Sequence, residues 1–338
     1  MNNEIKNANS ESLLTVSPSP HIRHGDSTRR IMLDVIIALI PALIWGVICF
    51  GIRALAVVLV SVVSCVIFEF GFQKLLSRKV TIDDLSAAVT GLLLGLNLPA
   101  TVPYWIPVIG SLFAIVVVKQ LFGGIGKNFM NPALAARVFL FAWPSEMTTF
   151  TQPFKRLGLF ASAEQIADIT ASATPLATLK SGNLPDISWV DLITGKCGGT
   201  IGEISSVLLI LGGIYLLARK VISWHIPVSL IGSVALLTAL FPQNNDVPAF
   251  VLCEIFAGGL ILGAFFMATD YATSPVTPKG RLIYGALCGA IIVFIRYFGG
   301  YPEGVSFGIL IMNTLVYYLD KFTKPRVFGK QRGGAKHG

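Results

Sequence analysis

Long apolar segments recur along this chain, and they constrain its fold more than any other feature. The residues are 54% hydrophobic and only 13% charged, which is too little charge to cover a soluble domain of this length. A helix needs about 20 apolar residues to cross a bilayer. We therefore expect an all-α polytopic membrane protein with about ten transmembrane helices. The expected spans are 31–50, 54–76, 85–98, 104–122, 132–143, 201–218, 222–241, 249–268, 282–298 and 305–319.

Lys and Arg residues between these segments predict how the chain is threaded. The net charge of +8 does not indicate nucleic-acid binding, because the basic residues form no patch and lie between apolar runs. Cytoplasmic connections are enriched in Lys and Arg. We expect both termini in the cytoplasm and the protein in the cell (cytoplasmic or inner) membrane, because the short outer connections then carry Arg53 alone. The basic residues counted inside are Lys74, Arg78, Lys79, Lys119, Lys127, Arg219, Lys220, Lys279, Arg281 and the tail from Lys321.

One long polar interruption separates the first five apolar segments from the last five, and the charge count places it outside the cell. A faint internal repeat agrees with this division, because the Leu-Leu-Leu-Gly run 92–95 resembles the Leu-Ile-Leu-Gly run 260–263. An offset of five spans inverts the second copy, as in many transport folds. The expected divisions are a cytoplasmic arm 1–30, a first five-helix repeat 31–143, an extracytoplasmic loop 144–199, a second, inverted five-helix repeat 200–320 and a basic cytoplasmic tail 321–338.

The polar loop holds Asp168-Ile169-Thr170-Ala171-Ser172-Ala173-Thr174-Pro175-Leu176. Pro175 disfavours helical geometry at the residue before it. The Thr174 hydroxyl should therefore be presented on exposed backbone, where Thr can accept a phosphoryl-type modification. Taken alone, the run also fits a plain polar loop.

Two further polar clusters fall on the expected cytoplasmic side. Asn128 and Asn131 precede the fifth span, and Asp270 follows the eighth. Asn131 before Pro132 is typical of a helix cap, which is the simpler interpretation. Asn amides could also bind a ligand that has both donors and acceptors. Asp270 is either an interfacial residue or, if it faces the bundle, a candidate ion or flavin contact.

Other constellations point to no chemistry. The 123–128 run lacks the spacing of a phosphate loop. The cysteines and histidines show neither metal-ligand nor catalytic-triad patterns, so we expect no metal ligands and no catalytic residues. The polar first 30 residues do not resemble a cleavable signal peptide. Glu69, Glu254 and Arg296 lie near the ends of spans, where we expect them to reach water.

The Asp-x-x-x-Ser-Ala-Thr-Pro-Leu run resembles the flavinylation motif of the RnfD family, which belongs to the Rnf ion-translocating electron-transport complexes. The related membrane flavoprotein of the sodium-pumping NADH:quinone reductase carries the same motif. In that motif a Thr hydroxyl takes FMN through a phosphoester bond. The resemblance assigns covalent FMN to Thr174, with Asp168 and Ser172 in its motif. Ala171 departs from the family pattern, which usually has Ser or Thr there. The Gly-Lys-Asn-x-x-Asn-Pro-Ala run, the Ala268–Pro275 run and the N-terminal Ser19–Thr28 region also match, so the resemblance covers nearly the whole chain.

This resemblance implies a membrane flavoprotein that carries electrons between ferredoxin and NAD with coupled Na⁺ or H⁺ translocation. It implies a non-covalent riboflavin or second FMN near Asn128, Asn131 and Asp270, and a fold similar to urea transporters. Such a protein is one part of a translocase and is not expected to catalyse alone. Its expected partners are membrane lipid, a flavin transferase and other Rnf subunits, including a second flavin-bearing subunit and iron–sulfur subunits. The alternatives are a protein like the membrane flavoprotein of the Na⁺-translocating NADH:quinone reductase, and a permease or channel without a redox role.

Overall fold

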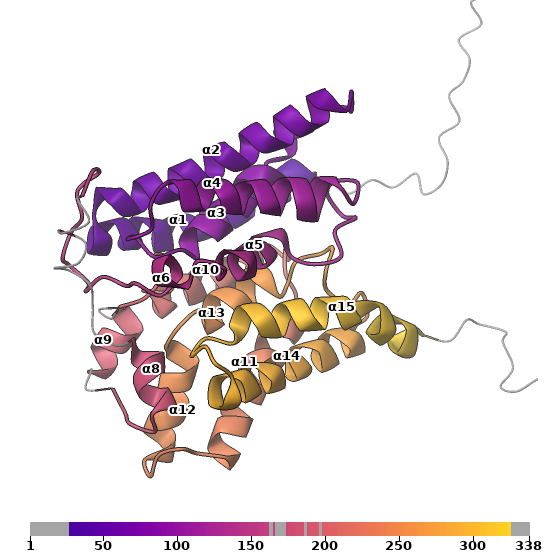
Figure 1. The fold of residues 1–338 in the computed structure, drawn as a ribbon. Coiled ribbons are helices and arrows are strands. Elements are labelled where there is room, and N and C mark those ends of the chain that lie inside the picture. Colours follow the sequence, from indigo (N-terminus) through magenta and orange to yellow (C-terminus); the bar gives the residue numbers. More distant parts are fainter. Residues whose placement is uncertain (1–26, 162–164, 166–173, 186–187, 196–197, 326–338) are drawn as a thin grey trace, which may run out of the picture.

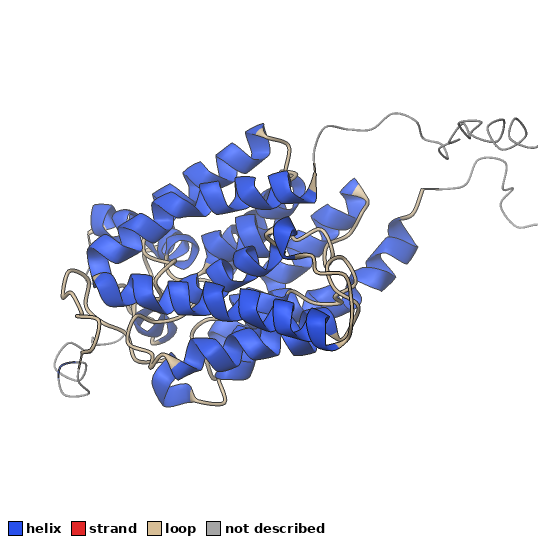
Figure 2. Ribbon diagram, turned by 90° about the horizontal axis from the view of Figure 1, so that it is seen from above, coloured by secondary structure: helices blue, strands red, loops and turns tan. Residues whose placement is uncertain are grey.

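Helices make up every regular element in the part of the chain that the structure describes (Figure 2). The structure is a computed structural model, and it describes residues 27–161, 165, 174–185, 188–195 and 198–325. Two groups of helices form its upper and lower parts in Figure 1, and they meet around α5 of the first group and α10 of the second.

The first group precedes the polar loop. It consists of α1 (Thr28–Phe50), α2 (Ile52–Leu75), the short η1 (Ile82–Asp84), α3 (Ser86–Leu96), α4 (Trp105–Leu112) continued by the π-helix η2 (Phe113–Gln120), and α5 (Pro132–Leu140). The second group consists of α10 (Ser206–Ala218), α11 (His225–Leu240), α12 (Val247–Phe256), α13 (Leu260–Leu262) continued by the π-helix η3 (Gly263–Met267), α14 (Pro278–Phe298) and α15 (Val305–Thr323). In the sequence, the short helices α6 (Pro144–Met147), α8 (Pro175–Lys180) and α9 (Trp189–Thr194) come between the two groups.

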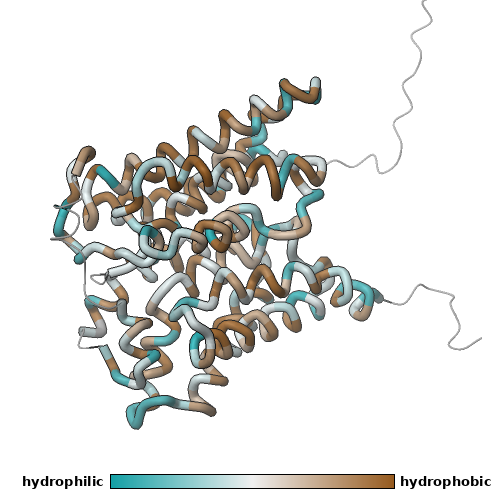
Figure 3. The backbone as a smooth tube through the Cα atoms, viewed as in Figure 1, coloured by the Kyte–Doolittle hydropathy of each residue, from teal (hydrophilic) through white to brown (hydrophobic). Residues whose placement is uncertain are grey.

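The membrane character of the helices is clear from their length and composition. Three helices, α1, α2 and α14, are long and apolar enough to cross a bilayer, and α12 with α13–η3 makes a fourth if the bent pair counts as one span. Shorter apolar helices are α3, α4–η2, α10 and α11. Residues along α1 and α2 are largely hydrophobic (Figure 3). Many of their apolar side chains are exposed, among them Ile44, Leu59 and Ile67, as expected for a surface that faces lipid.

The expected span 249–268 is not one continuous helix. It breaks between α12 and α13, and the two parts are bent by 59°. Gly258 takes a left-handed φ of +74° at the break, a conformation that glycine adopts without strain. Arg296 donates to the carbonyl oxygens of Glu254 and Ala257 there, so a cation stabilises the backbone groups that the break exposes.

Close backbone contacts hold the two groups together. The two runs of the internal repeat, 92–95 and 260–263, fall in α3 and at the junction of α13 and η3. Gly202 packs between them, because a Cβ there would lie 2.7 Å from Leu96 Cβ and 3.4 Å from Leu262 Cδ2. Its N–H also donates to Leu96 O at 2.7 Å. The two motifs therefore meet in the centre of the molecule.

The bundle has two distinct ends. Helix α1 begins and α15 ends at one of them, which we call the terminal end, and α6, α8 and α9 lie at the other, which we call the loop end (Figure 1). A helix rises about 1.5 Å per residue, so the 23-residue α1 separates the two ends by ~33 Å. The loop end is fixed to α1 by hydrogen bonds from Phe154 N and Leu157 N to Cys49 O and Phe50 O, of 2.9 and 3.0 Å.

Candidate functional sites at the two ends

A cavity of about 380 Å³ opens at the terminal end. It lies where the first residues of α1, α3 and α5 meet the last residues of η2, α10 and η3. Asn128, Asn131 and Asp270 all line it, so the structure brings together the two polar clusters that the sequence singled out. Its apolar wall includes Val89, Leu93, Phe265, Phe266 and Tyr271.

Asn131 is the N-cap of α5, as the simpler interpretation predicted. Its Oδ1 accepts from Ala133 N at 3.0 Å and from Leu134 N at 3.2 Å, and Pro132 occupies the first helical position. Its Nδ2 also donates to Met267 O at 3.3 Å. The cap bonds therefore fix Asn131 at the cavity wall, and the bond to Met267 O links α5 to η3.

Asp270 faces the cavity rather than only the surface. Its carboxylate accepts from Thr273 Oγ1 at 3.2 Å and from Ala272 N at 3.5 Å. Burial raises the pKa of Asp270, and the hydrogen bonds from these groups and from Asn128 oppose the rise. Asn128 itself is 7% exposed and donates to Met130 O. The cavity thus has an acceptor group and two fixed amides on one wall.

Asn313 on α15 was not singled out from the sequence, and it holds both polar segments in place. With its amide oriented to match its neighbours, Oδ1 accepts from Asn131 N at 3.1 Å and Nδ2 donates to Thr273 O at 3.1 Å. The Asn313 side chain is 4% exposed. In the sequence, the only signal for this residue is a polar side chain inside an apolar run.

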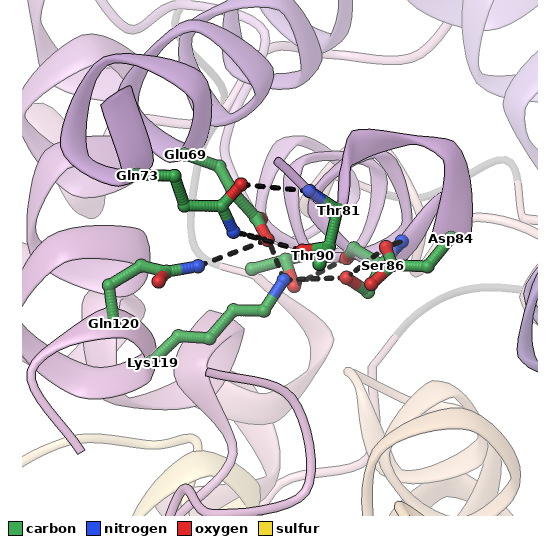
Figure 4. A network of polar contacts seen from close by, with 8 residues as sticks. All are labelled: Glu69, Gln73, Thr81, Asp84, Ser86, Thr90, Lys119 and Gln120. Carbon is green, nitrogen blue, oxygen red and sulfur yellow. Dashed lines mark hydrogen bonds and ion pairs between the residues drawn. The ribbon is translucent and has the colours of Figure 1, made fainter. Parts of the chain in front are cut away.

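Lys119 also lines the cavity, and its position corrects the expectation for this residue. The sequence placed it in a cytoplasmic connection, but it is 2% exposed and lies within η2. Its Nζ donates to Glu69 Oε2 at 2.7 Å and to Ser86 Oγ at 2.6 Å (Figure 4). Glu69 is buried as well, with further bonds from Gln73 and Gln120. The expectation that Glu69 reaches water is wrong, and it is equally wrong for Glu254 and Arg296, which form a buried pair.

Thr174 lies at the loop end. It is half-buried and precedes α8, with an extended backbone (φ −64°, ψ 157°) as Pro175 predicted. Its Oγ1 caps the helix weakly, because it accepts from Ala177 N at 3.4 Å. Asp168 and Ser172 lie outside the described residues. Thr174 lines a small cavity of about 50 Å³, together with Phe150, Leu176, Gly198, Gly199, Gly258, Glu203 and Glu303.

A buried charged cluster forms one side of this small cavity. Arg137 Nη2 donates to Glu203 Oε1 at 3.2 Å, and Arg137 Nη1 donates to Glu303 Oε1 at 2.9 Å. Arg137 Nη2 makes a second, short bond to Glu303 Oε2, and Nη1 also donates to Asn97 Oδ1 at 2.7 Å. No local pattern in the sequence indicates this cluster, because its members come from distant segments.

Helix α5 connects the two cavities. Asn131, its N-cap, lines the large cavity, and Arg137, near its C-terminus, binds the carboxylates that line the small one. No group of three or more His, Cys, Asp or Glu side chains among the described residues is arranged to hold a metal ion.

Comparison with known proteins identifies the family. Residues 15–329 match the model of the NQR2, RnfD, RnfE family. The chain belongs to this family. It is 49% identical over 320 residues to the D subunit of the Na⁺-translocating ferredoxin:NAD⁺ oxidoreductase complex of Acetobacterium woodii, covering 94% of this chain and 95% of that protein.

Other relatives in this family carry related names. The D subunit of the proton-translocating ferredoxin:NAD⁺ oxidoreductase complex of Clostridium ljungdahlii is 40% identical over 95% of this chain and 98% of its own length. The D subunit of the ion-translocating oxidoreductase complex of Stutzerimonas stutzeri is 39% identical over 91% of this chain and 94% of its own length. The similarity therefore includes both ends of the bundle.

Proposed function

We propose that this chain is the membrane flavoprotein of an Rnf-type electron-transport complex, and that it carries one flavin at each end of its helix bundle. The observation that supports this best is the similarity, over 94% of the chain, to a relative whose name states a ferredoxin:NAD⁺ oxidoreductase complex. Electron flow between ferredoxin and NAD would be coupled to Na⁺ or H⁺ translocation. The named relatives include one Na⁺-translocating and one proton-translocating complex.

The first flavin is FMN, held covalently by a phosphoester bond to Thr174. The residues around Thr174 fit this role, because the hydroxyl lies on extended backbone, is only half-buried and opens on a small cavity. A transferase can reach such a hydroxyl without unfolding a helix. When bound, FMN supplies the redox chemistry, and the protein holds and orients it.

The second flavin, riboflavin or FMN, is non-covalent and occupies the large cavity. A volume of about 380 Å³ is within the usual range for small-molecule sites, about 300 to 1,000 Å³. An isoalloxazine ring has flat apolar faces and one edge that alternates donors and acceptors. The aromatic wall suits the faces, and Asp270, Asn128 and Lys119 supply an acceptor, an amide and a cation for the edge.

The proposed membrane arrangement is ten segments in two inverted five-helix repeats, as in urea transporters. The helix order supports it, because five apolar helical segments precede the polar loop and five follow among the described residues, counting α4–η2 and α12–α13–η3 as one each. Most basic residues counted as cytoplasmic lie near helix ends at the terminal end, such as Lys74 on α2 and Lys321 on α15. We infer that the terminal end faces the cytoplasm and that Thr174 faces the other side.

This function requires partners. Electrons would reach and leave this chain through other Rnf subunits, including a second flavin-bearing subunit and iron–sulfur subunits, and a flavin transferase would load Thr174. The chain would act within the translocase class of enzymes and would not turn over substrates alone.

The test is a Thr174→Ala variant of the purified protein, with Thr170→Ala as the matched control. Intact-mass measurement and in-gel fluorescence after denaturation should show bound FMN in wild type and in the control, and none in Thr174→Ala. Membrane insertion should not change, because the hydroxyl accepts one weak hydrogen bond from the described residues. FMN retained on Thr174→Ala, or absent from wild type made with its transferase, would contradict the proposal and favour a permease without redox function.

A further inference from the structure

The charged cluster beside Thr174 has an unbalanced charge. Arg137 carries the only positive charge that contacts both Glu203 and Glu303 among the described residues, so two carboxylates share one guanidinium. The three side chains are 4%, 8% and 15% exposed, in the order Arg137, Glu203, Glu303. With all groups ionised, the cluster has a net charge of −1 in a site with little water. Such a charge is costly unless it is neutralised.

The surrounding groups do not remove this imbalance. Arg296 on α14 is the next cation, but it already pairs with Glu254 on α12 through Nη1 and Oε2 at 2.6 Å. Lys180 on α8 donates to the backbone oxygen of Gly299. Asn97, at the end of α3, is neutral and accepts from Arg137. Among the described residues no further cation balances this charge, which leaves its balance to something that the carboxylates bind.

We propose that Glu203 and Glu303, held by Arg137, form a proton-binding site that takes up one proton beside Thr174. The proton adds to a carboxylate oxygen and gives a neutral carboxylic acid, which leaves one carboxylate for one guanidinium. It comes from water, through the small cavity that both carboxylates and Thr174 line. The role of this site opposite a flavin on Thr174 rests on the proposed function, but proton binding itself does not.

A proton fits this site better than a metal cation. A metal ion needs several oxygen ligands around it, and the guanidinium already occupies one side of both carboxylates. The described residues offer no third acidic or histidine ligand at this place. The cavity of about 50 Å³ can hold a water or two, each of which occupies about 30 Å³ in the liquid. That is enough to deliver a proton.

The consequence for function concerns the charge at the loop end. Electrons that reach a group on Thr174 bring negative charge next to the two carboxylates, and a like charge nearby favours the protonated form. The proton affinity of the cluster should therefore rise when the flavin is reduced. Arg137 also lies on α5, whose N-cap borders the other cavity, so one helix contacts both sites.

Infrared difference spectroscopy of the purified full chain tests this proposal. In wild type, acidification should produce the carbonyl stretch of one protonated carboxylic acid that both Glu203→Gln and Glu303→Gln lack. Glu69→Gln is the matched control, because that buried carboxylate is paired one to one with Lys119 away from this cluster, and the band should persist. Size-exclusion profiles check that each variant is folded. A band that persists in both Gln variants, or one displaced by Na⁺ at constant pH, would overturn the proposal.

A second set of measurements separates this inference from the proposed function. Thr174→Ala should retain the acid-induced band, because the site needs only the chain. In wild type, reduction with dithionite at constant pH should increase the band, and Thr174→Ala should show no such increase. If Thr174→Ala keeps its FMN but the acid-induced band titrates as expected, the covalent site is wrong and the proton site stands. If the band is absent from both proteins, the proton site is wrong whatever the flavin content.

Discussion

The two ends of the bundle hold cavities of very different kinds. The terminal-end cavity is about 380 Å³ and is built from six helix ends, whereas the cavity at Thr174 is about 50 Å³ and lies beside a loop. The buried charges differ as well. Among the described residues Lys119 forms one ion pair, with Glu69, at the first site, whereas Arg137 forms two at the second.

This difference fits the two proposed ways of retaining a flavin. A non-covalent ligand must be held by a preformed cavity, because contacts alone compensate its lost freedom. A covalently attached ligand needs only an accessible hydroxyl, so the cavity around that hydroxyl can be small. The second carboxylate at the loop end gives that cluster a group that can take up a proton without leaving the cation unpaired.

The largest effect should come from removing the cation at each site. Lys119→Met leaves one buried carboxylate unpaired, which destabilises a protein by about 3–5 kcal/mol. Arg137→Met removes the guanidinium that holds both Glu203 and Glu303, so its loss of stability should be at least as large as that of Lys119→Met. Thermal unfolding in the same detergent, followed by intrinsic fluorescence, measures both.

The matched control is the double variant Lys119→Met with Glu69→Gln, which removes both charges and should recover most of the stability. An Arg137→Met variant as stable as wild type would contradict this prediction, because it would mean that Arg137 does not stabilise the two carboxylates.

A smaller effect is expected from Gly258→Ala at the break between α12 and α13. A Cβ there would lie 2.4 Å from Leu176 Cδ1, on a backbone with φ +74°, so overpacking and strain should destabilise the protein by about 1–3 kcal/mol. Because Leu176 belongs to α8, flavinylation of Thr174 should fall while the flavin of the terminal-end cavity remains.

Gly232→Ala in α11 is the control, since a Cβ at Gly232 meets nothing within 4 Å. Equal FMN loading in both alanine variants would argue against a mechanical link from the break to Thr174.

The dependence of stability on pH should separate the two ends further. Burial, with the Glu203 carboxylate, raises the pKa of Glu303 to about 7, above its value in an unfolded chain, about 4.3. The contribution of such a group is fully present below the unfolded pKa and is lost as pH rises through the folded pKa. Wild-type melting temperature should therefore fall as pH rises from about 4.3 through the raised pKa of Glu303.

In Glu303→Gln, the melting temperature should fall less steeply with rising pH than in wild type. An unchanged slope in the variant would mean that another group causes the pH dependence. Asp270, whose pKa burial also raises, is the group to test next.

The smallest effect should come from the Asn131 cap. Asn131→Ala removes the acceptor of two backbone N–H groups and should destabilise α5 by about 1 kcal/mol, with a matching loss of affinity for the flavin at the terminal end. Asn128→Ala removes an amide that caps no helix, so it should weaken flavin binding with less change in melting temperature. If both variants bind flavin as wild type does, the amides serve structure alone.

The sequence was sufficient for much of the fold, for identifiable physical reasons. Long apolar runs placed α1 and α2 within a few residues of their ends, and Pro175 correctly predicted extended backbone at Thr174. The break at Gly258 was missed because glycine is common in apolar helices. Lys119 was counted with a connection because its partner Glu69 is 50 residues away, and such distant pairing leaves no local pattern.

Only those parts of the candidate sites that leave a local pattern in the sequence could be predicted. Asn131 and Asp270 each stand out at a helix end, so their meeting could be anticipated from the proposed repeat. Arg137, by contrast, pairs with carboxylates 66 and 166 residues away, and only the folded chain brings them together.

Denaturing the purified protein and measuring both fractions of its flavin tests whether one flavin lies at each end of the bundle. One FMN should be retained on a peptide that contains Thr174 and one flavin should be released, and the released fraction should be lost when the terminal-end cavity is filled by Leu93→Trp. Retained FMN should be unchanged in that variant. If wild type releases no flavin, or if Leu93→Trp releases as much as wild type, the large cavity does not hold a flavin and the two-ended account is contradicted.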